Sequence, residues 1–166
     1  MTHLLLIAIA CLAWNLASAE PYAPTALPTG GGLAKDIAET AKDHIPDKDA
    51  VEAPPYPGAK IVSAGGGSWA EYGGQRREIL PHVSLVSTDP PEKVAAFYKT
   101  QLKDWHHAKE YGMFDVFWKG RKDQQNMGAP SVPTVVVSDT DGSSPDEQHL
   151  TGLKTRIDVY YQPAGR

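Results

Sequence analysis

Cysteine is almost missing from this chain, which has one cysteine among 166 residues. A single cysteine excludes an intramolecular disulfide and any zinc site built from several cysteines. Basic residues are not in excess either, because 16 Lys and Arg stand against 20 Asp and Glu and leave a net charge of -4. Proteins that bind DNA or RNA generally carry a positive surface. The composition therefore argues against a nucleic acid as the partner.

Long apolar segments are missing as well. The longest is the run over residues 4–16, which only Asn15 interrupts and which is shorter than the roughly 20 residues of a membrane-spanning helix. Residues 1–19 contain no Lys, Arg, Asp or Glu and end in Ala-Ser-Ala, the small residues that a signal peptidase recognises. We therefore predict a signal peptide over residues 1–19, cleavage before Glu20, and a periplasmic or secreted protein without a transmembrane span.

The lone cysteine, Cys11, lies inside this signal segment. A lipoprotein signal places small residues before an acylated cysteine. Residues 8–10 (Ala-Ile-Ala) fit that pattern loosely, without the usual leucine three residues before the cysteine. We expect Cys11 to be an ordinary apolar-run residue, with lipidation as the alternative. Cleavage before Glu20 would then leave a mature chain without cysteine.

Residues 20–53 are rich in Pro and Gly and carry the acidic charge. Between Glu20 and Glu52 there are three lysines and seven carboxylates, a net charge of -4, so the rest of the chain is neutral. One stretch, residues 33–45, repeats apolar side chains every four positions, as a short helix does, and Pro46 ends it. We predict a flexible tether with one short helix, which could dock on the domain or on a partner.

Regular patterns begin at Pro54 and predict a single α+β domain over residues 54–163. A helix is expected after Asp89, with Asp89 as its N-cap and Glu92 completing a capping box. Its buried face would consist of Val94, Phe97, Tyr98, Leu102 and Trp105.

Strand patterns flank this helix on both sides. They cover residues 60–64, 79–88, 106–110, 113–119, 132–138 and 153–161, whereas residues 65–74 are expected to form a glycine-rich loop. Because most connections are short enough for hairpins, we predict a small, mainly antiparallel sheet in the order β-β-α-β-β-β, with the helix packed on one face. Residues 106–110 would add an extra strand that pairs back on residues 113–119 through a turn at Tyr111 and Gly112.

Several motifs of this domain are similar to those of a widespread family of secreted or lipid-anchored bacterial envelope domains, which are uncharacterised. The motifs are Tyr56-Pro57-Gly58-Ala59, Ser87-Thr88-Asp89, Glu92-Lys93-Val94, Phe97-Tyr98 with Leu102 and Trp105, and Thr155-Arg156-Ile157. The resemblance covers roughly residues 54–162 and implies a small α+β fold and an envelope location. It implies no catalytic residues. Some members have a clear lipobox, which this chain lacks.

Known catalytic and metal-binding patterns do not fit this chain. The segment that begins at Gly65 has the letters of the dinucleotide-binding pattern G-x-G-x-x-A. A dinucleotide site also needs a helix that begins at this point, and a strand is expected instead. The acidic segment at Asp139 begins like a calcium loop, but Ser144 and Leu150 occupy the positions that require Gly and Glu. The histidines lack metal-ligand spacing. We predict no catalytic residues, no cofactor and no metal.

A pair of carboxylates that meet only in space remains open as a catalytic alternative. Asp115 and Asp158 both lie in the middle of expected strands, flanked by aromatic residues. The simpler interpretation makes them outward-facing ion-pair partners of Lys119 or Arg156.

Two groups of residues are candidates for binding. The glycine-rich loop combines mobile glycines with Trp69, Tyr72, Arg76 and Arg77, residue types that dominate binding energies at interfaces. The alternative is a plain hairpin loop whose Trp folds back on the core. A second candidate is a pocket between helix and sheet, lined by Trp105, Phe114, Trp118 and Tyr160.

These observations favour a non-enzymatic, exported binding module. Its partner would be an envelope protein or a cell-wall component, bound through a sheet face or the glycine-rich loop, with the acidic tether as a spacer. Two alternatives remain: a carrier of a small ligand or lipid in the helix–sheet pocket, and a hydrolase with dispersed carboxylates.

Overall fold

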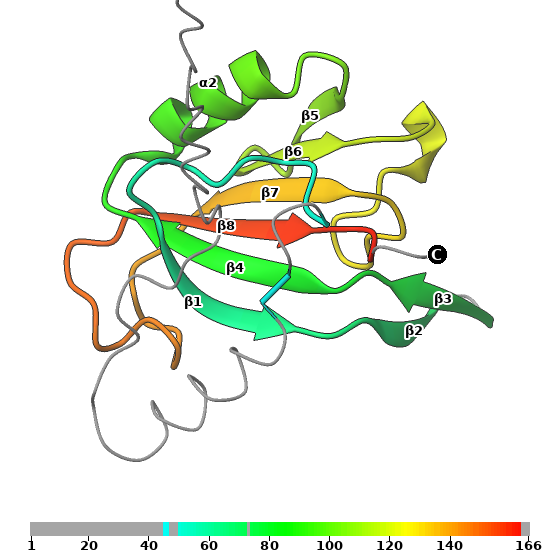
Figure 1. Ribbon diagram of the computed structural model, residues 1–166, viewed down its shortest axis with the longest axis horizontal. Helices are drawn as coiled ribbons and strands as arrows, with labels where there is room; N and C mark the ends of the chain where they lie inside the picture. The colour runs from blue at the N-terminus through cyan, green and yellow to red at the C-terminus, as the bar shows by residue number, and fades with distance from the viewer. Residues whose placement is uncertain (1–44, 47–49, 73, 164–166) are drawn as a thin grey trace, which may run out of the picture.

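The core of the protein is a six-stranded antiparallel sheet (Figure 1). The structure, a computed structural model, describes residues 45–46, 50–72 and 74–163, so the predicted signal peptide and most of the tether lie outside the described residues. The strand order is β1-β4-β8-β7-β6-β5. The strands are β1 (Lys60–Gly65), β4 (His82–Ser87), β5 (His106–Glu110), β6 (Phe114–Trp118), β7 (Thr134–Asp139) and β8 (Thr155–Tyr160). The predicted α+β class is confirmed.

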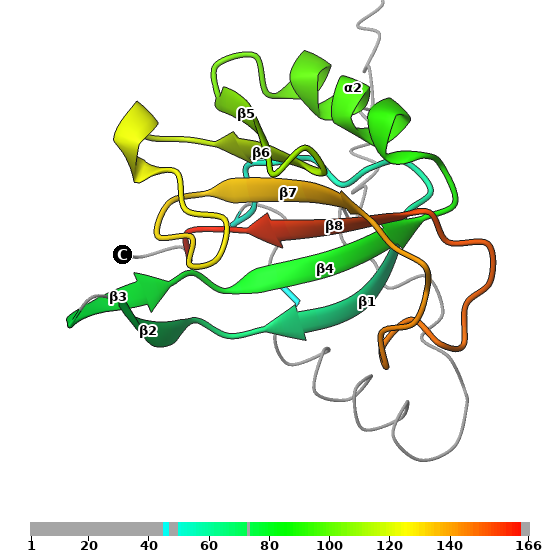
Figure 2. The ribbon, with the colours of Figure 1, turned by 180° about the vertical axis from the view of Figure 1, so that it is seen from behind.

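One face of this sheet is covered by the helix α2 (Pro91–Gln101), as both views show (Figures 1 and 2). The helix buries Val94, Ala95 and Tyr98. They pack on alternate residues of the sheet, among them Leu85 and Phe117. Four-residue spacing puts Val94 and Tyr98 on one side of a helix, which explains why this face is apolar.

The predicted cap of α2 is wrong by one residue. The N-cap is Pro90, which has no side-chain cap bond. The Asp89 carboxylate does not cap the helix. It accepts hydrogen bonds from the Tyr56 hydroxyl at 2.8 Å and from Lys93 Nζ at 2.9 Å. Asp89 therefore ties the segment before β1 to the start of the helix.

The opposite face of the sheet is buried too, at the β6–β7 side. Val116, Trp118 and Val136 form a second apolar cluster there. Residues on the long connection between β6 and β7, which includes the short 3-10 helix η1 (Lys122–Gln124), cover this cluster, with Met127 and Val132 packed against it. The valine-rich strand β7 is thus apolar on both faces because both faces are covered.

The folded unit begins before residue 54. Val51 and Ala53 are buried in the helix-side core, and Glu52 forms an ion pair with Lys119. The sequence predicts a start at Pro54, because regular patterns begin there and the Pro- and Gly-rich composition before it is typical of a tether. Burial of two small apolar residues before it outweighs that composition.

Candidate functional site

A second β-hairpin occupies the segment that was expected to be a glycine-rich loop. Its strands, β2 (Ser68–Tyr72) and β3 (Gln75–Ile79), pair with each other in a separate two-stranded sheet. Hereafter we call residues 68–79 the ribbon. It continues the β1–β4 pair and projects beyond the end of the main sheet (Figures 1 and 2).

A kink separates the ribbon from the main sheet. Leu80 and Pro81 stand between β3 and β4, and the Leu80 amide donates to the Pro130 carbonyl at 2.9 Å instead of to β1. On the other strand, a Cβ at Gly67 would lie 3.1 Å from the Ile79 carbonyl oxygen. The close approach of the two chains at the kink thus favours glycine at position 67. The single strand expected over residues 79–88 is therefore wrong at its start, because Leu80 and Pro81 separate β3 from β4.

Trp69 is exposed on this ribbon. The fractional exposure of the residue is 56%, and the Arg76 guanidinium lies over its indole ring, 4.6 Å from the ring centroid. Trp69 and Arg76 occupy the same face, because strand residues two apart share a face and Glu71 stands opposite Arg76. The alternative in which this Trp folds back on the core is therefore wrong.

The four residues predicted for this site do not all occupy the same face of the ribbon. Arg77 stands opposite Ala70, in positions that alternate with those of Trp69 and Arg76, so it belongs to the other face. Tyr72 stands opposite Gln75, in the same alternate set of positions. The structure brings Trp69 and Arg76 together and separates Arg77 from them.

The predicted helix–sheet pocket does not form. Trp105 packs against the helix-side core, whereas Trp118 belongs to the cluster on the opposite face, together with Phe114 and Tyr160. Strand alternation explains the error: Phe117, and not Trp118, points from β6 toward the helix. The four aromatic residues therefore line no common cavity.

Asp158 and Arg156 belong to an ion-pair network on the face opposite to the helix. Arg156 Nη1 lies 2.7 Å from Glu147 Oε1 and 3.1 Å from Asp146 Oδ2, and its Nε lies 3.2 Å from Asp158 Oδ1. Glu147 is fully buried. Burial alone lowers the pKa of Arg156, but the charges of Asp158, Asp146 and Glu147 outweigh burial and raise it. The network pins the loop before β8 onto the sheet.

Next to this network, the rings of His82 and Tyr160 pack at a tilt of 32°, with centroids 5.2 Å apart. Burial lowers the pKa of His82. Burial, helped by the charge of Asp158, raises the pKa of Tyr160 to about 12. Both rings are therefore held in their neutral forms at neutral pH.

Asp115 faces the helix side and has other partners than expected. Its Oδ1 lies 2.7 Å from His107 Nε2, and Lys99 and Lys109 approach within 3.8 and 3.7 Å. Lys119 pairs with Glu52 instead. Asp115 and Asp158 occupy opposite faces, since Asp115 stands across from Val137 and Asp158 from Val136. These two carboxylates do not form a pair.

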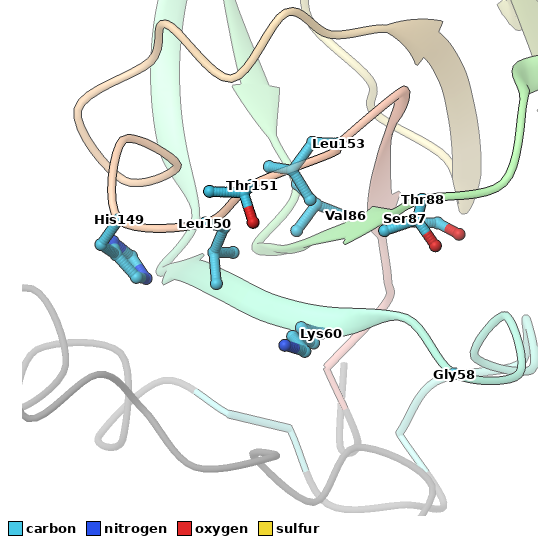
Figure 3. A pocket seen from close by; sticks show the side chains of 9 residues that line it. All are labelled: Gly58, Lys60, Val86, Ser87, Thr88, His149, Leu150, Thr151 and Leu153. Atoms are coloured by element: carbon cyan, nitrogen blue, oxygen red, sulfur yellow. The ribbon is translucent and has the colours of Figure 1, made fainter.

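A hollow of about 340 Å³ was not predicted from the sequence (Figure 3). We call it the β4-end pocket; its lining consists of Gly58, Lys60 and residues 86–88, 149–151 and 153. These segments are far apart in the sequence and meet only in the folded chain. No group of three or more His, Cys, Asp or Glu side chains suited to a metal occurs among the residues that the structure describes.

Comparison with known proteins adds no relative. No family model matches the chain, and neither a curated protein sequence nor a solved structure is significantly similar to it. The resemblance to bacterial envelope domains therefore stays a prediction. Within the described ranges, no helix has the length and apolar character needed to cross a membrane.

Proposed function

We propose that this protein is an exported, non-enzymatic binding module that engages an envelope protein or a cell-wall component through the ribbon. The observation that supports the proposal best is Trp69, a residue with a large apolar ring that is 56% exposed on a projecting hairpin. Burying such a ring in an interface releases more free energy than burying almost any other side chain.

Arg76 prepares Trp69 for binding. The guanidinium stacked on one side of the indole restricts the rotamers of both side chains before a partner arrives. Side chains that are already ordered lose less conformational entropy on association. Tryptophan and arginine are also the types most enriched among residues that dominate interface energies.

The ribbon itself suits an interaction element. Trp69, Glu71 and Arg76 on one face and Gln75 and Arg77 on the other are all exposed. An isolated two-stranded hairpin is only marginally stable in water, so a partner that covers one face would stabilise it. A peptide or a glycan chain could do so by packing on Trp69 and bonding to the flanking polar groups.

Export is part of the same proposal. It rests on the apolar, uncharged segment 1–19 and its Ala-Ser-Ala end. Purified mature protein whose first residue is Glu20 would support this part, and a chain that retains residues 1–19 in the cytoplasm would overturn it.

Binding through the ribbon is tested by comparing wild type with Trp69→Ala. We expect co-sedimentation with purified cell-wall sacculi, or retention of one envelope protein on the immobilised chain, to fall at least tenfold, because a central interface Trp contributes about 2 kcal/mol or more. Tyr111→Ala is the matched control, since Tyr111 is a 79% exposed aromatic residue outside the ribbon. Equal losses for both variants, or no loss for Trp69→Ala, would contradict the proposal.

A further inference from the structure

The β4-end pocket lies on the sheet face opposite to the helix. Lys60 and Val86 stand directly across from each other on β1 and β4, and Val86 alternates with Leu85, which belongs to the helix-side core. The pocket is at the start of β1, whereas the ribbon follows the end of β1 (Figure 1). It is therefore a separate site, and an inference about it does not rest on the proposed function of the ribbon.

The floor and roof of the pocket are apolar. Val86 comes from β4, while Leu150 and Leu153 come from the loop that the Arg156 network holds against the sheet. The three side chains gather in the middle of the hollow (Figure 3). A volume of about 340 Å³ is at the lower end of the range for pockets that bind small molecules.

The rim of the pocket is polar, and its only formal charge is positive. Lys60 contributes an ammonium group, His149 an imidazole, and Thr88 and Thr151 contribute hydroxyls. No carboxylate lines the pocket. Among residues 45–46, 50–72 and 74–163, Lys60 forms no ion pair, whereas Lys93, Lys99, Lys109 and Lys119 each do.

The carboxylates nearest along the chain are already engaged. Asp89, next to Thr88, binds Lys93 and Tyr56. Glu147, two residues before His149, binds Arg156 and Thr140. Asp89 and Glu147 therefore already have cationic partners. The Ser87 hydroxyl oxygen accepts the Asp89 amide at 3.1 Å, and Ser87 alternates with Val86, so its side chain belongs to the helix-side face.

We propose that this pocket binds a small ligand with an oxyanion, a phosphate or a carboxylate, attached to an apolar body. The anion would lie against the ammonium of Lys60 at the polar rim. The apolar part would pack on Val86, Leu150 and Leu153. Lysine and hydroxyl groups are common partners of such anions, and a hydrogen bond to a charged group is about twice as strong as a neutral one.

The test is an NMR titration of the full-length mature chain with three probes: phenyl phosphate, benzoate and benzyl alcohol. We expect saturable shifts of the Lys60, Thr88 and Leu150 amides with at least one of the two anions and much weaker shifts with the neutral alcohol. The two anions distinguish phosphate from carboxylate. Absence of shifts at these residues with both anions, or equal affinity for benzyl alcohol, would overturn the proposal.

Two variants of Lys60 separate charge from shape. Lys60→Met keeps the length of the side chain and should weaken anion binding roughly tenfold or more, whereas Lys60→Arg should retain it. Lys122→Met removes an exposed lysine outside the pocket and should bind like wild type. Unchanged anion affinity in Lys60→Met would contradict the assignment. If Lys60→Met does not fold, the comparison of anions with the neutral alcohol on wild type decides alone.

Discussion

At the scale of single residues, Arg156 has the largest expected effect on stability. It forms ion pairs with three carboxylates, one of which, Glu147, is completely buried. Removing one partner of such a pair leaves a charge that is neither solvated nor compensated. The main cost of losing Arg156 is therefore the buried charge of Glu147 that is left without a partner, and not the loss of any single ion-pair contact.

We predict that Arg156→Met lowers the free energy of unfolding by about 3 kcal/mol. Urea denaturation of wild type and variant at neutral pH measures this difference in the free energy of unfolding. The control is Asp123→Asn, which breaks the exposed pair with Arg121 and should cost less than about 0.5 kcal/mol. A loss for Arg156→Met no larger than that of the control would show that Glu147 is not an uncompensated buried charge in the variant.

His82 predicts a dependence of stability on pH. Burial holds its folded-state pKa below the ordinary value of 6.5, so below that pH the unfolded chain binds a proton that the folded chain resists. The stabilising contribution is complete above pH 6.5 and is lost as the pH falls through the folded-state pKa. We expect an NMR titration of the His82 ring to give a pKa below 6.5, and His82→Phe to reduce the loss of stability in acid. A ring pKa at or above 6.5 would contradict this explanation.

At the scale of elements, the turn between β5 and β6 combines one favourable and one unfavourable residue. Both of its central residues have positive φ, 48° at Tyr111 and 73° at Gly112. Glycine adopts this conformation freely, but a tyrosine does not. The Tyr111 side chain is 79% exposed, so it buries little area in return.

We predict that Tyr111→Asn stabilises the domain by about 1 kcal/mol, because Asn tolerates the left-handed conformation. Gly112→Ala should destabilise it by a similar amount, because an alanine is strained at this positive φ. A steric clash would not contribute, since a Cβ at that position meets no atom within 4 Å. Thermal unfolding of both variants measures the two effects. Shifts of the same sign would rule out backbone conformation as the cause.

Elements with a local signal were predicted well from the sequence. The β5–β6 hairpin was expected over 106–110 and 113–119, and β8 has the predicted alternation, with Ile157 and Val159 buried. The glycines at positions 65–67 and 73–74 predict one loop, but the five residues between them form the strand β2. The high glycine content of residues 65–74 favours a loop, but the gap between the two groups of glycines is long enough for a strand.

Contacts between distant segments could not be predicted. The exposure of Trp69 depends on the kink at Pro81, which turns the ribbon away from the sheet. Arg156 and Glu147 are close in sequence, yet their pairing depends on how the loop before β8 folds onto the sheet. Residue type alone makes Trp69 and Arg76 candidates for binding. That they share one face of the ribbon follows only from the register of β2 and β3.

At the scale of the whole molecule, the start of the folded domain can be tested by truncation. A chain covering 54–163 lacks Val51 and Ala53, both buried in the helix-side core, as well as the Glu52–Lys119 pair. We predict that it is less stable than a chain covering 50–163 by at least about 2 kcal/mol, mainly through the exposed apolar surface. Equal midpoints in urea would show that residues 50–53 are not part of the core.

The proposed function makes the ribbon the part of the molecule that meets a partner. The most direct measurement is photocrosslinking in the cells that produce the protein, with a photoreactive residue at position 69 in one strain and at position 111 in another. We predict that position 69 gives a discrete crosslinked envelope protein or cell-wall adduct, which Arg76→Ala weakens, and that position 111 does not. The absence of any adduct at position 69, or the same adduct at both positions, would contradict binding through the ribbon.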